Sequence, residues 1–167
     1  MDEKPRIAKL AISHDSTRFD CGHEALNNFI HLHALPGQRA NISQTYVAVM
    51  GETIVGHHTL VVGNVLYEDA PERLGKGIPR HPIPVLLLAR LAVDQSWQGK
   101  GLGAALVLDA IRRTLQVADI AGVRALLVHA KDETACRFYA HLGFEPFPGE
   151  PLVLYRLLKD LRAMTKA

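Results

Sequence analysis

The spacing of apolar residues along the chain predicts a mixed order of strands and helices. Runs rich in β-branched and aromatic residues predict strands, and apolar residues that repeat every three to four positions predict helices. The expected strands are Lys9–Ile12, Thr45–Met50, Thr53–Gly63, Val85–Val93, Ala125–His129 and Leu152–Leu157. The expected helices are a short one around Leu26–His33, then Gly103–Ala118, Asp132–His141 and Lys159–Met164. This order predicts one mixed α/β domain spanning residues 1–167.

Glycine and proline mark the breaks between these elements. The Gly51-Glu52 pair predicts a hairpin turn, and Pro36-Gly37 predicts the end of the first helix or a bend after it. The segment Tyr67–Pro84 combines several prolines and glycines with basic residues, so we expect a long irregular loop, a kind that is usually functional or disordered. The strand after it, Val85–Val93, is almost wholly apolar and predicts burial on both faces.

Composition narrows the class of protein. With 167 residues, 48% of them hydrophobic, and a net charge of +2, the chain has ordinary globular composition that permits a polyanionic partner without demanding one. We expect no membrane span and no secretory signal, because no apolar run is long enough. Two cysteines without a CxxC pair favour free thiols in a cytoplasmic protein, and nine scattered histidines predict no metal site.

The segment Gln98–Gly103 (QGKGLG) lies between an expected strand and an expected helix. The first turn of a helix has unpaired backbone N–H groups and the positive end of the helix dipole, so it attracts an anion. Glycines let the backbone approach that anion, and Lys100 adds a charge. The GxxxxGK[ST] signature of nucleotide hydrolases is absent, and GxGxG fits the dinucleotide fingerprint GxGxxG poorly. A tight turn without a ligand is the remaining alternative.

Two motifs carry a resemblance to a known family. Arg90–Asp94 followed by Trp97–Gly103 resembles the Gln/Arg-x-x-Gly-x-Gly/Ala signature of the GCN5-related N-acetyltransferase (GNAT) superfamily, and Cys136–Phe144 resembles its FY…GF helix and turn. The resemblance implies a mostly antiparallel mixed sheet flanked by helices, acetyl-CoA as co-substrate and no metal. It implies cofactor contacts at Leu91, Ala92, Val93, Gln98, Gly99, Lys100, Gly101, Leu102, Gly103 and Ala104. Lys131–Thr134 departs from the family, which often has an asparagine there.

A narrower resemblance points to a subfamily. Phe19–Gly22, Pro82–Val85 and Val123–Ala130, together with the two motifs above, resemble the acetyltransferase toxins of bacterial toxin–antitoxin pairs. This resemblance implies acetylation of the α-amino group of aminoacyl-tRNA, which blocks translation. It also implies a ribbon-helix-helix antitoxin as partner and a homodimer.

Transfer of an acyl group from a thioester to an amine needs a neutral amine and a protonated leaving thiolate. Tyr139 lies at the family position of the acid, and a phenol with a pKa near 10 can donate that proton. The alternative is a core tyrosine packed beside Phe138 and Phe144. An α-amine, with a pKa near 7.7–8.0, is partly neutral at pH 7, whereas lysine near 10.4 is not. Four residues are candidate general bases by residue type alone: Glu52, Asp94, Glu133 and His129. Because no stronger signal marks a base, the sequence favours an α-amine as the acceptor.

Basic residues in or near loops before the central strand are candidates for contacts to tRNA phosphates. They are Arg39, Arg73, Lys76, Arg80 and Arg90. The alternative for each is a solvated surface charge. Two other functions share the same motifs: a GNAT enzyme acting on a small-molecule amine or a protein N-terminus, and a non-catalytic coenzyme A-binding module.

Overall fold

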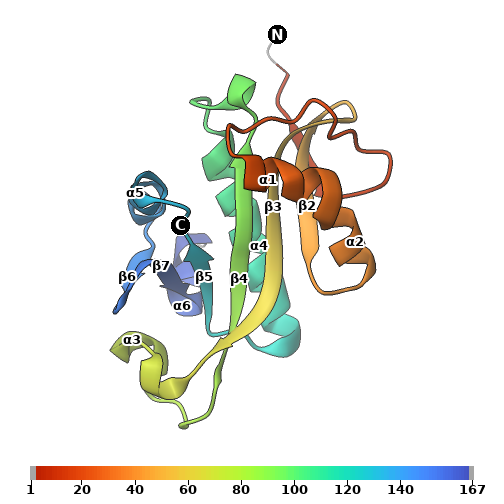
Figure 1. The fold of residues 1–167 in the computed structure, drawn as a ribbon. Coiled ribbons are helices and arrows are strands. Elements are labelled where there is room, and N and C mark those ends of the chain that lie inside the picture. The colour runs from red at the N-terminus through yellow and green to blue at the C-terminus, as the bar shows by residue number, and fades with distance from the viewer. Residues whose placement is uncertain (1–2, 166–167) are drawn as a thin grey trace. The chain divides into compact units, whose positions relative to one another are not determined.

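The computed structural model describes residues 3–165 and contains a seven-stranded sheet in the order β1-β2-β3-β4-β5-β7-β6 (Figure 1). The strands are β1 (Arg6–Lys9), β2 (Gln44–Met50), β3 (Thr53–Val65), β4 (Ile83–Val93), β5 (Ala125–His129), β6 (Glu145–Phe147) and β7 (Glu150–Leu157). β4 and β5 pair in parallel, whereas the β1–β2, β2–β3, β5–β7 and β6–β7 pairs are antiparallel. The predicted mixed, mostly antiparallel sheet is confirmed.

Helices connect these strands. They are α1 (Glu24–Asn28), the π-helical η1 (Phe29–His33), α2 (Ala34–Arg39), the 3-10 turns η2 (Tyr67–Asp69) and η3 (Gln95–Trp97), α3 (Glu72–Gly75), α4 (Leu102–Ala121), α5 (Glu133–His141) and α6 (Leu158–Thr165). Among residues 3–165, no helix is both long and apolar enough to cross a membrane.

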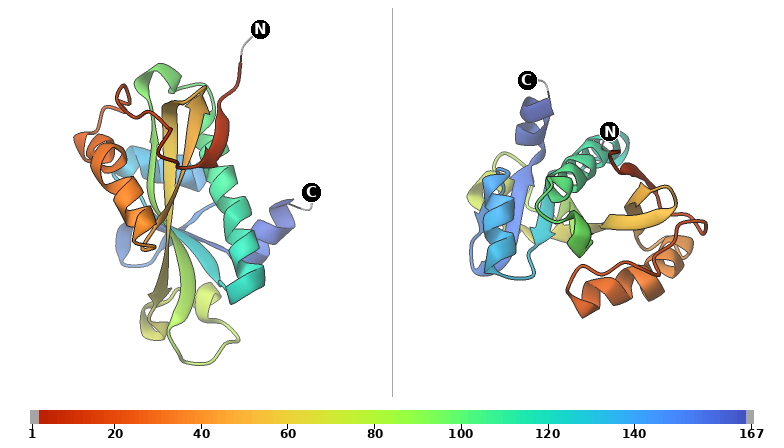
Figure 2. Two further views of the ribbon diagram at one scale, coloured as in Figure 1. Left: turned by 90° about the vertical axis from the view of Figure 1, so that its right-hand side faces the viewer. Right: turned by 90° about the horizontal axis from the view of Figure 1, so that it is seen from above.

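The chain forms two compact units, of which the first comprises Met1–Val61 and Ala89–Ala110. Its strands have two apolar faces because successive side chains of a strand point to opposite sides. On one face, Val47 and Val49 of β2 pack with Phe19 and with Ile30 of η1. On the other face, Ala48 and Val55 pack with residues of the first turns of α4, Leu102 and Leu106. Figure 2 shows the α1-η1-α2 segment and the start of α4 on opposite sides of β2.

The second unit comprises Val62–Leu88 and Ile111–Ala167. Its core joins β5 and β7 to the segment before β4, with Leu74, Ile83 and Leu127 among the buried residues. The turn after α5 is fixed by a close approach: Gly143 has φ +96°, and a Cβ there would lie 2.8 Å from the Arg156 guanidinium. Arg156 Nη1 also donates to the Leu142 carbonyl at 2.8 Å, so this arginine closes the end of α5.

Two predicted boundaries near the N-terminus are wrong. The first strand ends at Lys9 instead of beginning there, because the Ala11 N–H donates to His14 Nδ1 at 2.9 Å and turns the chain. The helical segment does not stop at Pro36-Gly37 but continues to Arg39. Pro36 lies in the first turn of α2, where a missing N–H is tolerated, and the preceding π-helical turn changes the hydrogen-bond register ahead of it.

The segment Tyr67–Pro84 is more ordered than predicted, since it contains η2 and α3, and β4 already begins at Ile83. Arg124 holds this segment, because its Nε and Nη2 donate to the carbonyls of Leu74 and Lys76 at 3.0 and 2.8 Å. The sequence prediction also missed β6, which has only three residues.

His57 is a buried polar residue in the middle of β3. It is fully buried against the rings of Phe19 and Phe29, with ring centroids 5.1 and 6.1 Å away. The Leu26 carbonyl favours its protonated form slightly, yet neither ring nitrogen completes a hydrogen bond among the described residues. Burial, followed by the charge of His58, lowers the pKa of His57 to about 3. The imidazole is therefore neutral at physiological pH.

This burial makes the first unit sensitive to acid. Because the folded pKa lies below the ordinary value of 6.5, the stability contribution is complete above pH 6.5 and is lost as the pH falls toward about 3. The free energy of unfolding of the wild type should decrease between pH 6.5 and pH 4. We expect this decrease to be smaller by about 1–3 kcal/mol in His57→Phe. Urea unfolding at stepped pH measures this. The control is His23→Phe, at an exposed histidine with no cap hydrogen bond, and an unchanged acid limb in His57→Phe would contradict the assignment.

Candidate active site

The predicted strand–loop–helix arrangement is present at the end of β4. Gly99 and Gly101 have φ values of +77° and +85°, and neither would meet an atom within 4 Å if it carried a Cβ. The Ala105 N–H donates to the Gly101 carbonyl at 3.1 Å, which is the first bond of α4. Gly101 has no side chain to cap the N–H groups that precede that bond. The start of α4 therefore offers N–H donors that have no partner among the described residues, beside open space, as an anion site requires.

The side chains of this loop have different environments. Leu102 is buried in the core, so only its backbone faces the loop. Lys100 is exposed, and its Nζ lies 4.9 Å from the centroid of the Trp97 ring, a cation–π distance. Gly103 is half-buried and Ala104 is exposed. The polar surface of the loop thus consists of backbone N–H groups and one lysine.

Gln98 serves the fold through its side chain. Its Nε2 donates to the Val93 carbonyl at 2.9 Å and to the Cys21 carbonyl at 3.1 Å. Both amide hydrogens are therefore used within the protein. Gln98 ties the end of β4 to the Phe19–Gly22 turn, and it can contribute only backbone or carbonyl groups to a ligand.

Asp94 acts as the N-cap of η3. Its carboxylate accepts from Asp20 N at 2.9 Å, from Ser96 N at 3.0 Å and from Ser96 Oγ at 2.6 Å. Partial burial raises the pKa of Asp94, but the hydrogen bonds from Ser96 and Asp20 outweigh this effect and hold that pKa below its usual value. A carboxylate stabilised in this way is a weak proton acceptor, so Asp94 does not suit the role of general base.

The Phe19–Gly22 turn braces the same loop from the other side. The Gln95 N–H donates to the Asp20 carbonyl at 2.9 Å, and Asn27 Nδ2 donates to Asp20 Oδ1 at 2.9 Å. The Asn27 amide, followed by the Gly22 N–H, lowers the pKa of Asp20. Sequence reasoning missed the roles of Asp20, Asn27 and Gln95, because Gln95 is far from Asp20 in the chain and no local pattern marks the nearer Asp20–Asn27 pair.

The central strand β4 uses its side chains for packing. Ala92 is buried on the face that carries Phe19, whereas Leu91 and Val93 pack on the face of α4. A ligand along the last residues of this strand would therefore meet backbone groups. Arg90 is exposed; its Nη1 donates to the Ala89 carbonyl at 2.8 Å, and its guanidinium lies 5.1 Å from the Phe29 ring centroid.

Tyr139 lies on α5 in the second unit and is 6% exposed. Its ring packs edge-on against Phe138 and Phe144, with centroids 5.1 and 5.7 Å away. Within residues 3–165 the phenol forms no hydrogen bond, and burial raises its pKa well above the usual value near 10. The hydroxyl is therefore protonated at neutral pH, as a proton donor must be. The alternative role expected from the sequence, a core tyrosine packed beside Phe138 and Phe144, is also compatible with this packing.

The departure at Lys131–Thr134 has a structural role. Asp132 is the N-cap of α5, and its Oδ1 accepts from the Ala135 N–H at 2.8 Å. This capping explains how the helix that carries Tyr139 begins.

The predicted phosphate-binding residues are divided between the two units. Arg39 and Arg90 belong to the first unit, and Arg73, Lys76 and Arg80 belong to the second. Arg73 is paired, because it donates to Glu145 Oε2 and, at 3.0 Å, to Asp160 Oδ2. Arg80 lies 5.4 Å from the Tyr67 ring centroid. Arg73 thus joins α3 to β6 and α6.

Comparison with known proteins defines the family. The model of the acetyltransferase (GNAT) domain matches residues 41–146, so the chain belongs to the GNAT acetyltransferase family. It is an acetyl-CoA-dependent N-acetyltransferase. Within the described residues, no group of three or more histidine, cysteine, aspartate and glutamate side chains could hold a metal ion.

The family resemblance read from the motifs is confirmed by individual relatives. The tRNA-acetylating toxin of Mycobacterium tuberculosis is 41% identical over 156 residues, which cover 93% of each chain. The structure of AtaT complexed with acetyl-methionyl-tRNAfMet has a TM-score of 0.90 and 33% identity, covering 96% of this chain and 98% of that one. A tyrosine-to-phenylalanine mutant of AtaT, bound to the C-terminus of the antitoxin AtaR and acetyl-CoA, has a TM-score of 0.84 and 30% identity, covering 99% and 100%.

Proposed function

We propose that this enzyme transfers the acetyl group of acetyl-CoA to the α-amino group of aminoacyl-tRNA and so blocks translation as a bacterial toxin. The observation that carries this proposal is the match over nearly the whole chain to a tRNA-acetylating toxin. The similarity to AtaT in its complex with an acetylated methionyl-tRNA supports the same acceptor.

In this proposal, the backbone of Leu91, Ala92 and Val93 holds the pantetheine arm, and the loop from Gln98 to Ala104 holds the pyrophosphate of acetyl-CoA. The neutral amine attacks the thioester carbonyl, its nitrogen loses a proton to solvent, and the carbon–sulfur bond breaks. Tyr139 gives its proton to the departing thiolate and regains one from solvent. The unpaired N–H groups at the start of α4 and the protonated, buried phenol support these assignments.

The state of Asp94 favours an α-amine as acceptor. An α-amino group with a pKa near 7.7–8.0 is partly neutral at pH 7, so its enzyme needs no strong base. Asp94, one of the carboxylates closest in sequence to the loop, is held in its ionised form by three hydrogen bonds. A lysine acceptor near 10.4 would need a base that this carboxylate cannot provide.

We further propose a single catalytic domain over residues 1–167, a homodimer in the cytoplasm, and a ribbon-helix-helix antitoxin as partner. The complex of AtaT with the C-terminus of the antitoxin AtaR supports an antitoxin as partner. The cytoplasm is the compartment where charged tRNA is found.

The test is incubation of the protein with acetyl-CoA and a mixture of charged tRNAs, followed by mass spectrometry of the aminoacyl ends. We expect N-acetylated aminoacyl ends that depend on acetyl-CoA. Turnover of polyamines or peptide N-termini without acetylation of any charged tRNA would replace the proposal with the small-amine alternative. Coenzyme A binding without turnover of any acceptor would favour the non-catalytic module.

A further inference from the structure

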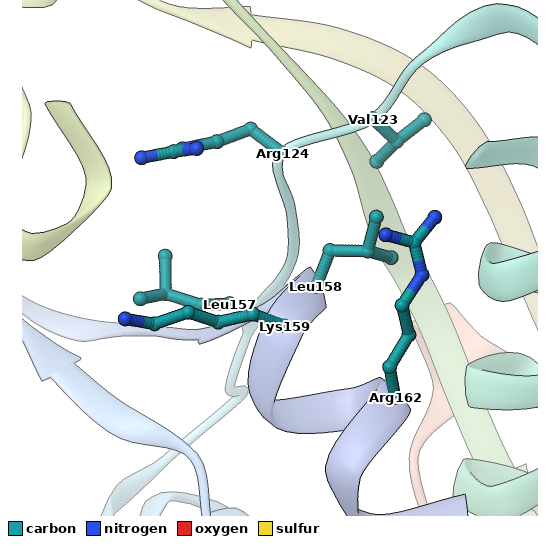
Figure 3. Close-up of a pocket in the computed structure, with 6 residues that line it drawn as sticks. All are labelled: Val123, Arg124, Leu157, Leu158, Lys159 and Arg162. Atoms are coloured by element: carbon teal, nitrogen blue, oxygen red, sulfur yellow. The ribbon is translucent and has the colours of Figure 1, made fainter. Parts of the chain in front are cut away.

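A pocket of about 150 Å³ lies in the second unit, between the segment that precedes β5 and the start of α6. Its lining combines an apolar floor with three cationic side chains: Val123, Leu157 and Leu158, and Arg124, Lys159 and Arg162. Figure 3 shows Arg124 and Lys159 both extending to the left of the view, and the Arg162 guanidinium beside Leu158 to the right. None of these residues belongs to the catalytic site proposed above.

Arg124 is held in place before any ligand arrives. Its Nε and Nη2 donate to the carbonyls of Leu74 and Lys76, while its Nη1 forms no hydrogen bond among residues 3–165. The two bonds fix the guanidinium, so its remaining N–H groups keep one direction. A charge that is already oriented binds an anion without the entropy cost of ordering a long side chain.

The other two cations are available. Lys159 is exposed and has no partner among the described residues. Arg162 donates to Asp119 at 3.2 Å, but both side chains are largely exposed, at 49% and 76%, and such pairs contribute little. With Asp119 counted against the three cations, the rim has a net charge of +2.

The size of the pocket limits the ligand. Pockets for whole drug-sized molecules measure about 300–1,000 Å³, so a pocket near 150 Å³ takes one part of a larger ligand. An anionic group at the cations and an apolar edge on Val123, Leu157 and Leu158 match a phosphate with its attached sugar. From this match we infer that the pocket binds a backbone phosphate of the RNA substrate, an inference that rests on the proposed acetylation of tRNA.

Arg124 keeps one edge of its guanidinium for an anion. Nε and Nη2 each donate to a backbone carbonyl, so both N–H groups of Nη1 and the second N–H of Nη2 remain for phosphate oxygens, which arginine binds well. In addition, the chain has a net charge of only +2, so a tRNA must be held by local groups of cations and not by overall charge.

The site also changes the prediction made from the sequence. Arg73 is paired with Glu145 and Asp160, whereas the neighbouring Lys76 contributes its carbonyl to fixing Arg124. In this inference, the segment Tyr67–Pro84 contributes to RNA binding indirectly, because the carbonyls of Leu74 and Lys76 hold the Arg124 guanidinium in place.

The test compares Lys159→Glu with Lys9→Glu, at an exposed lysine of the first unit, so that both variants change the charge equally. Binding of deacylated tRNA is followed by fluorescence anisotropy at several salt concentrations. We expect Lys159→Glu to raise Kd about 3–10-fold and to lower the salt slope by about 1. Lys159→Arg, which keeps the charge, should restore binding. Thermal unfolding confirms that each variant is folded.

The outcomes separate this inference from the function on which it rests. A wild-type protein that neither binds tRNA nor acetylates charged tRNA overturns the proposed function. If the wild type does both, and Lys159→Glu binds tRNA as well as Lys9→Glu does, the pocket assignment alone is wrong. It is also wrong if Lys159→Glu weakens only the capture of an acidic antitoxin peptide.

Discussion

Tyr139→Phe is expected to lower kcat for charged tRNA by about 10²–10⁴-fold and to leave the affinity for acetyl-CoA unchanged. The substitution removes one oxygen and keeps the ring that packs against Phe138 and Phe144. Because the phenol forms no hydrogen bond among the described residues, its loss breaks no contact there. The effect therefore reports proton donation to the thiolate rather than packing.

The measurement is a single-turnover rate together with a coenzyme A titration. The matched control is Tyr155→Phe, because Tyr155 is also buried in the second unit and also packs edge-on, against Phe147. This control should keep kcat within about twofold. Burial raises the pKa of Tyr139, so the wild-type rate should not decline through its ionisation up to about pH 10. A kcat of Tyr139→Phe within threefold of wild type would assign Tyr139 to the core instead.

Elements with strong local patterns could be predicted from the sequence. β5 and the β2–β3 hairpin follow from runs of β-branched residues around turns, and α4 from its long apolar face. Their predicted boundaries differ from the structure by at most three residues. The mixed α/β class followed from their order, whereas the mostly antiparallel sheet and the family followed from the resemblance of two motifs to those of GNAT enzymes.

Features that depend on distant residues could not be predicted. The pairs that fix the loop, Asp20 with Asp94 and Cys21 with Gln98, are separated by 74 and 77 positions. The partners of Arg73 lie 72 and 87 positions away in the chain, so the sequence around Arg73 shows only a basic loop and gives no sign of these ion pairs. β6 was missed for a different reason: three residues that include Pro146 give no alternation, and only pairing with β7 makes them a strand.

Gly101→Val is expected to raise KM for acetyl-CoA about 10–100-fold, equivalent to about 1.4–2.7 kcal/mol. Gly101 has φ +85°, a conformation that costs L-residues about 1–2 kcal/mol, and a β-branched residue resists it further. Relief of this strain would turn the peptide groups at the start of α4 away from the anion. The side chain would also enter the open space beside the loop, where the proposed pyrophosphate lies.

A second glycine of the same unit separates strain from ligand binding. Gly51, in the β2–β3 turn, has φ +62°, and a Cβ there would meet equally open space. Gly51→Val should therefore lower the melting temperature about as much as Gly101→Val does, without changing KM for acetyl-CoA. Thermal unfolding and steady-state kinetics on both variants give the comparison. If the two variants have the same KM for acetyl-CoA, backbone strain alone explains the need for glycine at position 101, and the loop does not hold the cofactor. If only Gly101→Val binds acetyl-CoA poorly, the cofactor occupies the open space beside Gly99 and Gly101.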